Sequence, residues 1–88
     1  MKLRDKVAIV TGGAQGIGRG IACCLAEEGA DVVIADINME NANRVAEEVK
    51  SFGRRALVEE ADVTRKDDVE RVVRNTLNSF GKIDILVN

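Results

Sequence analysis

Short apolar runs alternate with longer amphipathic stretches along this chain. The apolar runs are continuous rather than alternating, and they consist mostly of Val, Ile, Leu and Ala. Continuous runs of this length are typical of strands buried on both faces of a parallel sheet. The pattern predicts four strands, at Lys6–Val10, Asp31–Asp36, Arg55–Ala61 and Asp84–Asn88.

Three stretches with helical spacing separate the predicted strands. The first should span Ile17–Glu28, the second should begin after Asn38, and the third should begin at Thr64. Asn38 is a preferred N-cap residue, and Thr64 followed by Asp67 resembles a capping box. A glycine follows each stretch where helices commonly end, namely Gly29, Gly53 and Gly81.

Each predicted helix has one apolar face, which should cover the sheet. In chain order, these faces consist of Ile17, Ile21, Cys24 and Leu25, then Ala42, Val45, Ala46 and Val49, then Val69, Val72, Val73, Leu77 and Phe80. Alternating strands and helices favour an α/β fold with a doubly wound parallel sheet, right-handed crossovers and strand order 3-2-1-4. Ligands of such sheets bind at the carboxyl ends of the strands, which places the expected crevice after the first strand.

The segment Thr11–Gly18, with the sequence TGGAQGIG, joins the first strand to the first helix. Gly12 would permit the tight exit from the strand, Gly16 would let the backbone approach a phosphate, and Gly18 would let the helix pack closely on the sheet. The N–H groups near Ile17 and the helix dipole would then bind a pyrophosphate. The alternative is a glycine-rich turn without a ligand.

Asp36 ends the second predicted strand, eighteen residues after Gly18. Its carboxylate can accept hydrogen bonds from both ribose hydroxyls of an adenosine, and its charge would repel a 2′-phosphate. Two like charges about 4 Å apart repel by about 4 kcal/mol at an effective dielectric constant near 20. Neither Ile37 nor the two residues after it is basic, so the sequence predicts NAD rather than NADP as the cofactor. A helix-cap or loop role for Asp36 is the alternative.

Asp62 follows the third predicted strand and would lie beside an adenine pocket. Its carboxylate could accept a hydrogen bond from the exocyclic amine, and the N–H of Val63 could serve a ring nitrogen. Spacing alone favours the plainer interpretation of Asp62 as a solvated turn residue.

Composition excludes several function classes. The 88 residues include no His and no Tyr, which excludes His-dependent nucleophilic catalysis and a tyrosine acid–base within this chain. The net charge of −2, without a basic stripe, favours neither nucleic acid nor a membrane surface as a partner. No apolar run is long enough to span a membrane and no signal peptide is evident, so the cytoplasm is the expected location.

The remaining conspicuous side chains have plainer interpretations. Cys23 and Cys24 lack metal-ligand spacing, and we expect both to be small packing residues and no metal site. Charged helix surfaces such as Glu47–Glu48 should be solvated. The pair Arg54–Arg55 could approach a phosphate, although a surface position is favoured.

Several motifs together resemble the short-chain dehydrogenase/reductase family. Thr11–Gly18 resembles its TGxxxGxG cofactor motif, and Asp36 matches the NAD-preferring members. Ala61–Thr64 resembles the adenine-contacting turn, and Asp84–Asn88 resembles the run into the NNAG motif, ending after its first Asn. The resemblance covers the whole chain and implies the first half of a Rossmann-like domain.

The resemblance also implies residue roles. It implies that Asp62, Val63 and Asn88 contact the adenosine side of the cofactor, with Ile37 beside them. It further implies that Thr11 steadies the turn and the neighbouring fourth strand.

Cofactor choice, by the same resemblance, depends on Asp36 rather than on Gln15 or Arg19. NADP-preferring members often carry a basic residue at the position of Gln15, which this sequence does not.

The family's catalytic Ser, Asn and Tyr-x-x-x-Lys pair lie later in the chain, so no catalytic residue can be assigned here. We expect residues 1–88 to be the N-terminal dinucleotide-binding portion of an oxidoreductase that interconverts an alcohol and a carbonyl compound, truncated within or just after the fourth strand. The chain alone should bind NAD but be inactive. The full-length parent, expected to be a homo-oligomer such as a tetramer, would bind the small-molecule substrate.

Three alternatives remain open at this point. The chain could be a stand-alone dinucleotide-binding or regulatory module, or a truncated product without a function of its own. Within the family, the parent could be a 3-oxoacyl-thioester reductase.

Overall fold

The computed structural model describes all 88 residues and contains strands and helices in strict alternation. The strands are β1 (Val7–Thr11), β2 (Asp31–Asp36), β3 (Ala56–Glu60) and β4 (Ile85–Val87), and the helices are α1 (Gly16–Glu27), α2 (Met39–Ser51) and α3 (Lys66–Phe80). All strand pairs are parallel, in the order β3-β2-β1-β4. The predicted fold class and strand order are therefore confirmed.

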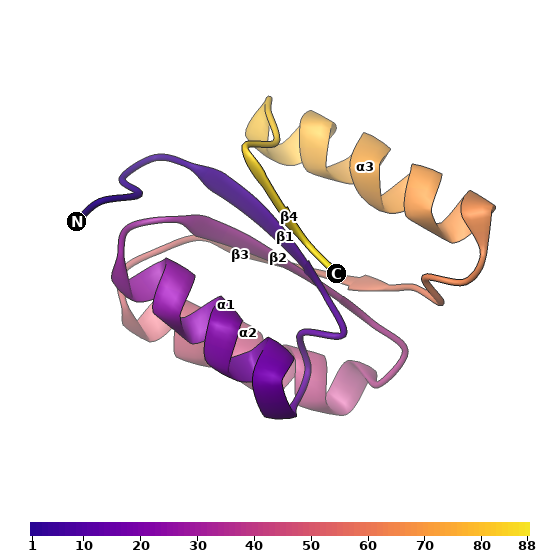
Figure 1. Ribbon diagram of the computed structural model, residues 1–88, viewed down its shortest axis with the longest axis horizontal. Helices are drawn as coiled ribbons and strands as arrows, with labels where there is room; N and C mark the ends of the chain where they lie inside the picture. Colours follow the sequence, from indigo (N-terminus) through magenta and orange to yellow (C-terminus); the bar gives the residue numbers. More distant parts are fainter.

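Two layers of helices enclose the sheet, as Figure 1 shows: α1 and α2 cover one face and α3 covers the other. This arrangement follows from right-handed crossovers. The chain moves in one direction across the sheet from β1 to β3 and returns in the other direction to β4, so α3 must lie on the opposite face. None of the helices is long and apolar enough to cross a membrane.

The core is divided between the two faces of the sheet, because successive strand residues point to opposite sides. Val10, Val32 and Ile34 point towards α1 and α2, whereas Ile9 and Val33 point towards α3. The predicted face of α2 is fully buried, whereas in α3 only Val72 of the predicted face is. Thr76, which the hydrophobic pattern omits, is completely buried and donates a hydrogen bond to the carbonyl of Val72 (2.7 Å).

The predicted apolar face of α1 is wrong in part. Ala22 and Ala26 are buried, whereas Cys24 is exposed and Ile17 is 84% exposed. Small side chains let α1 lie close to the sheet, which shifts the contact line away from the bulkier residues. The larger members of the expected face pack only partly against the core, namely Ile21 and Leu25.

The predicted capping box of α3 is also wrong. The hydroxyl of Thr64 donates to Asp62 Oδ1 (2.6 Å) instead of capping the helix. The helix begins at Lys66 without a side-chain cap. By contrast, Asn38 caps α2 as predicted, accepting a hydrogen bond from the N–H of Asn41 (3.0 Å).

A buried carboxylate lies at the amino ends of the strands. The Asp31 side chain is only 2% exposed and accepts hydrogen bonds from the Arg55 N–H (2.9 Å) and from two guanidinium nitrogens of Arg55 (2.7 and 3.0 Å). It also forms an ion pair with Arg54 (3.2 Å). Burial raises the pKa of Asp31, but the hydrogen bonds and charges of the two arginines outweigh it and hold the pKa below its usual value.

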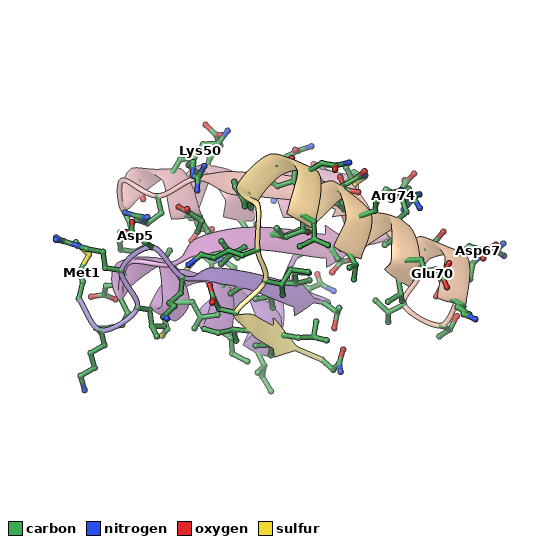
Figure 2. The ribbon with its side chains drawn as sticks, turned by 90° about the horizontal axis from the view of Figure 1, so that it is seen from above. Met1, Asp5, Lys50, Asp67, Glu70 and Arg74 are labelled. Atoms are coloured by element: carbon green, nitrogen blue, oxygen red, sulfur yellow. The ribbon has the colours of Figure 1, made fainter.

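Arg54 and Arg55 therefore lie at the edge of the sheet opposite to the glycine turn, so neither approaches a phosphate bound at that turn. The Arg55 guanidinium also stacks on Phe80, 4.5 Å from the ring centre, and connects the end of α3 to the sheet. Figure 2 shows charged side chains along the solvent side of α3, among them Asp67, Glu70 and Arg74.

Side chains secure both ends of the short strand β4. Asp84 Oδ2 accepts a hydrogen bond from the Val7 N–H (2.9 Å) before the strand begins. At the other end, the Thr11 hydroxyl donates to the carbonyl of Val87 (3.1 Å). Thr11 thus steadies the fourth strand as the sequence suggested.

Candidate functional site

Three turns meet at the carboxyl edge of the sheet, where β1, β2 and β3 end side by side. They surround a cavity of about 180 Å³. Its walls contain most of the residues predicted to hold an adenosine, together with two alanines: Gly12, Ala35, Asp36, Ile37, Ala61, Asp62 and Val63. The order β3-β2-β1 therefore brings together residues that lie far apart in the sequence.

Glycine conformations shape the first of these turns. Gly12 (φ 66°) and Gly16 (φ 59°) adopt the left-handed region, which other L-residues rarely populate. The Gly12 N–H donates to the carbonyl of Ala35 (2.8 Å) and fixes the turn against β2. A side chain on Gly18 would overlap the Gly12 carbonyl. Gly18 thus permits close packing of α1 on the turn itself, rather than on the strands as expected.

The N-terminus of α1 differs from those of the other two helices. It has no side-chain cap and no acidic residue in its first turn. Asn38 caps α2, and Asp67 and Asp68 stand in the first turn of α3. The first N–H groups of α1 and its positive dipole end therefore remain available to an anion. Ile17, one residue into this helix, exposes 84% of its surface beside them.

Asp36 points towards the glycine turn. Its Oδ2 accepts a hydrogen bond from the Ala14 N–H (3.1 Å), and its Oδ1 accepts one from the Asn38 N–H (2.9 Å). Two backbone donors from two turns thus hold the carboxylate at the wall of the cavity. Each oxygen retains a further lone pair, which suits two neighbouring hydroxyl donors.

Asp62 is held by its own turn. Its Oδ1 accepts hydrogen bonds from the hydroxyl (2.6 Å) and the N–H (3.0 Å) of Thr64, and these lower the pKa of the Asp62 carboxyl, the hydroxyl contributing most. Asp68, which the sequence analysis missed, accepts a hydrogen bond from the Asp62 N–H (2.8 Å). Oδ2 of Asp62 has no hydrogen-bond partner within the chain and remains available as an acceptor.

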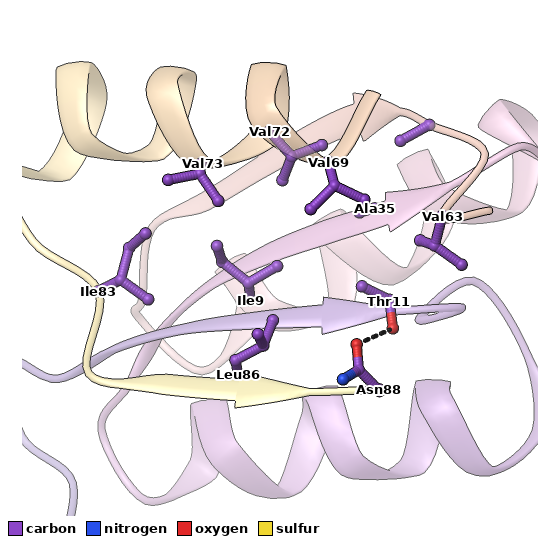
Figure 3. A pocket seen from close by; sticks show the side chains of 11 residues that line it. Ile9, Thr11, Ala35, Val63, Val69, Val72, Val73, Ile83, Leu86 and Asn88 are labelled. Atoms are coloured by element: carbon purple, nitrogen blue, oxygen red, sulfur yellow. Dashed lines mark hydrogen bonds between the residues drawn. The ribbon is translucent and has the colours of Figure 1, made fainter. Parts of the chain in front are cut away.

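Asn88 lies apart from the other predicted site residues. Its Oδ1 is 3.4 Å from the Thr11 hydroxyl, a contact shown in Figure 3. Both residues border a groove of about 470 Å³ between α3 and the sheet, rather than the cavity of about 180 Å³ beside Asp36. The groove, which we call the α3 groove, is otherwise lined by apolar residues, namely Ile9, Ala35, Ala61, Val63, Val69, Val72, Val73, Ile83 and Leu86.

A third cavity, of about 340 Å³, lies between α1 and α2 next to the glycine turn. We call it the α1–α2 cavity, and it is mostly polar, lined by Ala14, Gln15, Gly16, Arg19, Asn41, Arg44, Val45 and Glu48. The Arg19 guanidinium forms two parallel hydrogen bonds with the Glu48 carboxylate, each 2.8 Å long. Two other lining residues are also joined, because the Asn41 amide donates to Gln15 Oε1 (3.1 Å).

Glu48 is therefore not simply the solvated surface residue that the sequence suggested, and Asn41 was missed. A signal was available for both. They lie seven residues apart on α2, on the same face of the helix, and Arg19 supplies the complementary charge on α1.

The two cysteines differ in their surroundings. Cys24 is exposed, so its expected packing role is wrong. Cys23 is half-buried with its thiol 3.5 Å from Glu48, and burial followed by that carboxylate raises the pKa of the Cys23 thiol. A raised pKa disfavours the reactive thiolate. No group of three or more His, Cys, Asp or Glu side chains is placed to hold a metal ion.

Known proteins are similar to this chain in sequence. The chain is 42% identical over its full length to the (2S)-[(R)-hydroxy(phenyl)methyl]succinyl-CoA dehydrogenase subunit BbsD of Thauera aromatica, of which it covers 36%. It is 39% identical over its full length to the 7alpha-hydroxysteroid dehydrogenase of Escherichia coli strain K12, of which it covers 34%. The chain thus spans about a third of the length of these relatives.

Solved structures agree with the sequence relatives. An NAD+-bound xylitol dehydrogenase superposes with a TM-score of 0.94 and 36% identity, over 98% of this chain and 33% of that one. The apo glucose dehydrogenase of Caenorhabditis elegans gives a TM-score of 0.92 and 36% identity, over 100% of this chain and 38% of that one. Residues 6–88 also match the family model described as short chain dehydrogenase. The chain therefore belongs to the short-chain dehydrogenase family of oxidoreductases, whose Rossmann fold binds nicotinamide dinucleotides.

Proposed function

We propose that residues 1–88 form the NAD-binding portion of an oxidoreductase that interconverts an alcohol and a carbonyl compound by hydride transfer. One observation carries the proposal. The uncapped N-terminus of α1 and the backbone-held carboxylate of Asp36 meet at one edge of the sheet, on either side of the glycine turn. A diphosphate and a ribose need these two features at neighbouring positions.

The chain's own residues would divide the work of binding. The N–H groups of Gly16, Ile17 and Gly18 would bind the diphosphate, assisted by the α1 dipole. Asp36 would accept hydrogen bonds from the ribose hydroxyls, and the turn at Asp62 would contact the adenine. When bound, NAD supplies the hydride-transfer chemistry, and this portion of the protein binds and orients it.

The position of Asp36 favours NAD over NADP. Because Ala14 and Asn38 hold both oxygens, the carboxylate is not free to turn away from a 2′-phosphate. Repulsion of about 4 kcal/mol at about 4 Å corresponds to a preference of about a thousandfold. The two N–H donors and the charge of Asp36 together therefore favour the cofactor whose adenosine ribose has a free 2′-hydroxyl.

Catalysis and substrate binding would belong to parts of the protein that this chain does not include. No His or Tyr is present to move a proton, so the chain alone should not transfer hydride. We assign the catalytic residues, the small-molecule substrate site and assembly into a homo-oligomer to a longer, cytoplasmic parent. The open α3 groove favours this proposal over a stand-alone binding module, because apolar surface of that kind needs a cover.

Titration calorimetry of the 88-residue chain with NAD, NADP and ADP-ribose tests the proposal. NAD and ADP-ribose should bind, and NADP should bind far more weakly. Asp36→Asn should weaken NAD binding about tenfold and reduce the preference over NADP, because one charged acceptor is lost. Asp67→Asn, which removes the same charge from the solvent side of α3, should change neither affinity. Failure of a folded chain to bind NAD or ADP-ribose would contradict the proposal.

A further inference from the structure

We infer that Glu48 is a specificity-determining residue, which disfavours NADP by neutralising Arg19 in the α1–α2 cavity. The inference rests on the proposed function, because it concerns the ribose that Asp36 would hold. It adds a determinant on α2, twelve residues beyond Asp36 in the sequence.

The α1–α2 cavity adjoins the ribose position. Ala14 lines this cavity, and its N–H donates to the Asp36 carboxylate (3.1 Å). Gln15 and Gly16, the next two residues of the glycine turn, also line it. A phosphate attached to a ribose beside Asp36 would therefore lie next to this cavity, whose volume of about 340 Å³ can accommodate it.

The two arginine side chains that line the cavity are already paired with carboxylates. Arg19 forms two 2.8 Å hydrogen bonds with Glu48, and Arg44 pairs with Glu40 at 2.8 Å. The bidentate Arg19–Glu48 pair fixes the orientation of the guanidinium plane and also neutralises its charge. The cavity thus offers polar groups but no unpaired positive charge to a phosphate.

Of the two pairs, the Arg19 pair is the better constrained. The Glu48 side chain is 37% exposed and the Arg19 side chain 55%, whereas Arg44 and Glu40 are 69% and 79% exposed and lie one turn apart on the same helix. The Cys23 thiol provides Glu48 with a further contact. The Arg19 hydrogen bond lowers the pKa of Glu48, so this carboxylate stays ionised at neutral and mildly acidic pH.

Dissociation constants for NAD and NADP, measured on the 88-residue chain, test the role of Glu48. The constants are measured in the wild-type chain and in an Asp36→Ser background. In that background the NADP dissociation constant should be low enough to measure. Glu48→Gln should shift the ratio of the two constants towards NADP by about threefold to tenfold, because Arg19 becomes free to pair with the phosphate. The Arg19→Gln/Glu48→Gln double variant should lose this gain.

Glu47→Gln is the matched control. Glu47 is the neighbouring residue on α2, carries the same charge and pairs with Lys50 (3.2 Å), but it does not line the cavity. This variant should leave the ratio unchanged. Circular dichroism and thermal unfolding check each variant, and Glu48→Ser provides a second substitution if Glu48→Gln folds poorly.

The outcomes separate this inference from the proposed function. A wild-type chain that binds NAD, with a ratio unchanged in both Glu48 variants, overturns the role of Glu48 and leaves the NAD site intact. A gain that persists in the double variant also overturns it, since the gain would not depend on Arg19. A folded wild-type chain that binds no NAD overturns the proposed function and this inference together.

Discussion

The two faces of the sheet are covered very differently. Under α1 and α2, side chains such as Val10, Ile34 and Val49 are completely buried in a single cluster. Under α3, a smaller cluster borders the α3 groove of about 470 Å³, and Val69 and Leu86 remain 39% and 58% exposed. Two helices close one face, whereas one helix closes only part of the other.

The difference indicates which face stabilises this chain and which face leaves apolar surface open. Buried apolar area is the main favourable term in folding, so the closed face should dominate the free energy of unfolding. The open face exposes the kind of contiguous apolar surface that marks a docking position. The proposed dinucleotide site lies at the carboxyl edge between them, and the cavity of about 180 Å³ beside Asp36 shares Ala35, Ala61 and Val63 with the α3 groove.

The largest expected effect comes from breaking the connection between α3 and the sheet. Asp31→Asn leaves two arginines beside a neutral amide, and it should lower the free energy of unfolding by about 3 kcal/mol. Because Arg55 also stacks on Phe80, the variant should loosen α3 and increase binding of an apolar fluorescent dye to the open face. Urea unfolding and dye fluorescence measure the two effects. Asp67→Asn, at an exposed carboxylate in the first turn of α3, should lower the free energy of unfolding by less than about 1 kcal/mol and leave dye binding unchanged.

The same carboxylate predicts a pH dependence. The pKa of Asp31 is lowered in the folded chain, so its contribution is fully present above the unfolded value of about 4 and is lost as the pH falls through the folded value. Stability should therefore decline below about pH 4, and the Asp31→Asn variant should show a flatter decline. Equal slopes for the two proteins would contradict the assignment.

A matched pair of helix substitutions compares the two faces directly. Val45 on α2 is 1% exposed and Val69 on α3 is 39% exposed. Val45→Ala should lower the free energy of unfolding by about 2 kcal/mol, because it opens a void in a closed core. Val69→Ala should lower it by less than about 1 kcal/mol. Urea unfolding of both variants gives the comparison, and equal costs would show that the faces are packed alike.

The smallest stability effect is expected in the groove itself. Leu86→Ser should change the free energy of unfolding by less than about 0.5 kcal/mol, because the side chain is already largely solvated. It should nevertheless reduce binding of the apolar dye. Phe52→Ser, at an exposed apolar residue outside the groove, serves as the control and should leave dye binding unchanged. Dye binding that responds equally to both substitutions would argue against the groove as the dye site.

The elements that the sequence predicted well are those determined by local pattern. Continuous Val- and Ile-rich runs can be buried on both faces only in the middle layer of such a fold, and the handedness of crossovers then sets the strand order. The glycine turn could also be predicted, because the positive φ angles at positions 12 and 16 favour glycine there.

The features that escaped prediction depend on contacts between distant segments. Hydrophobicity alone places Ile17 inside, but the turn orients α1 so that Ala22 lies on the sheet. The complementary charges of Arg19 and Glu48 are visible in the sequence, but their pairing depends on the distance between two helices, which no local pattern contains. The Thr64 hydroxyl was expected to cap α3, but the folded turn brings it to Asp62 instead.

The hydrogen bonds at the two ends of β4 have a consequence for how the strand separates from β1. The strand pairs with β1 through only three residues, yet Asp84 and Thr11 secure its two ends. Short pairings at the edge of a sheet are among the first to open locally. Because a hydrogen bond holds each end of β4, we expect the strand to leave β1 only when both bonds open together.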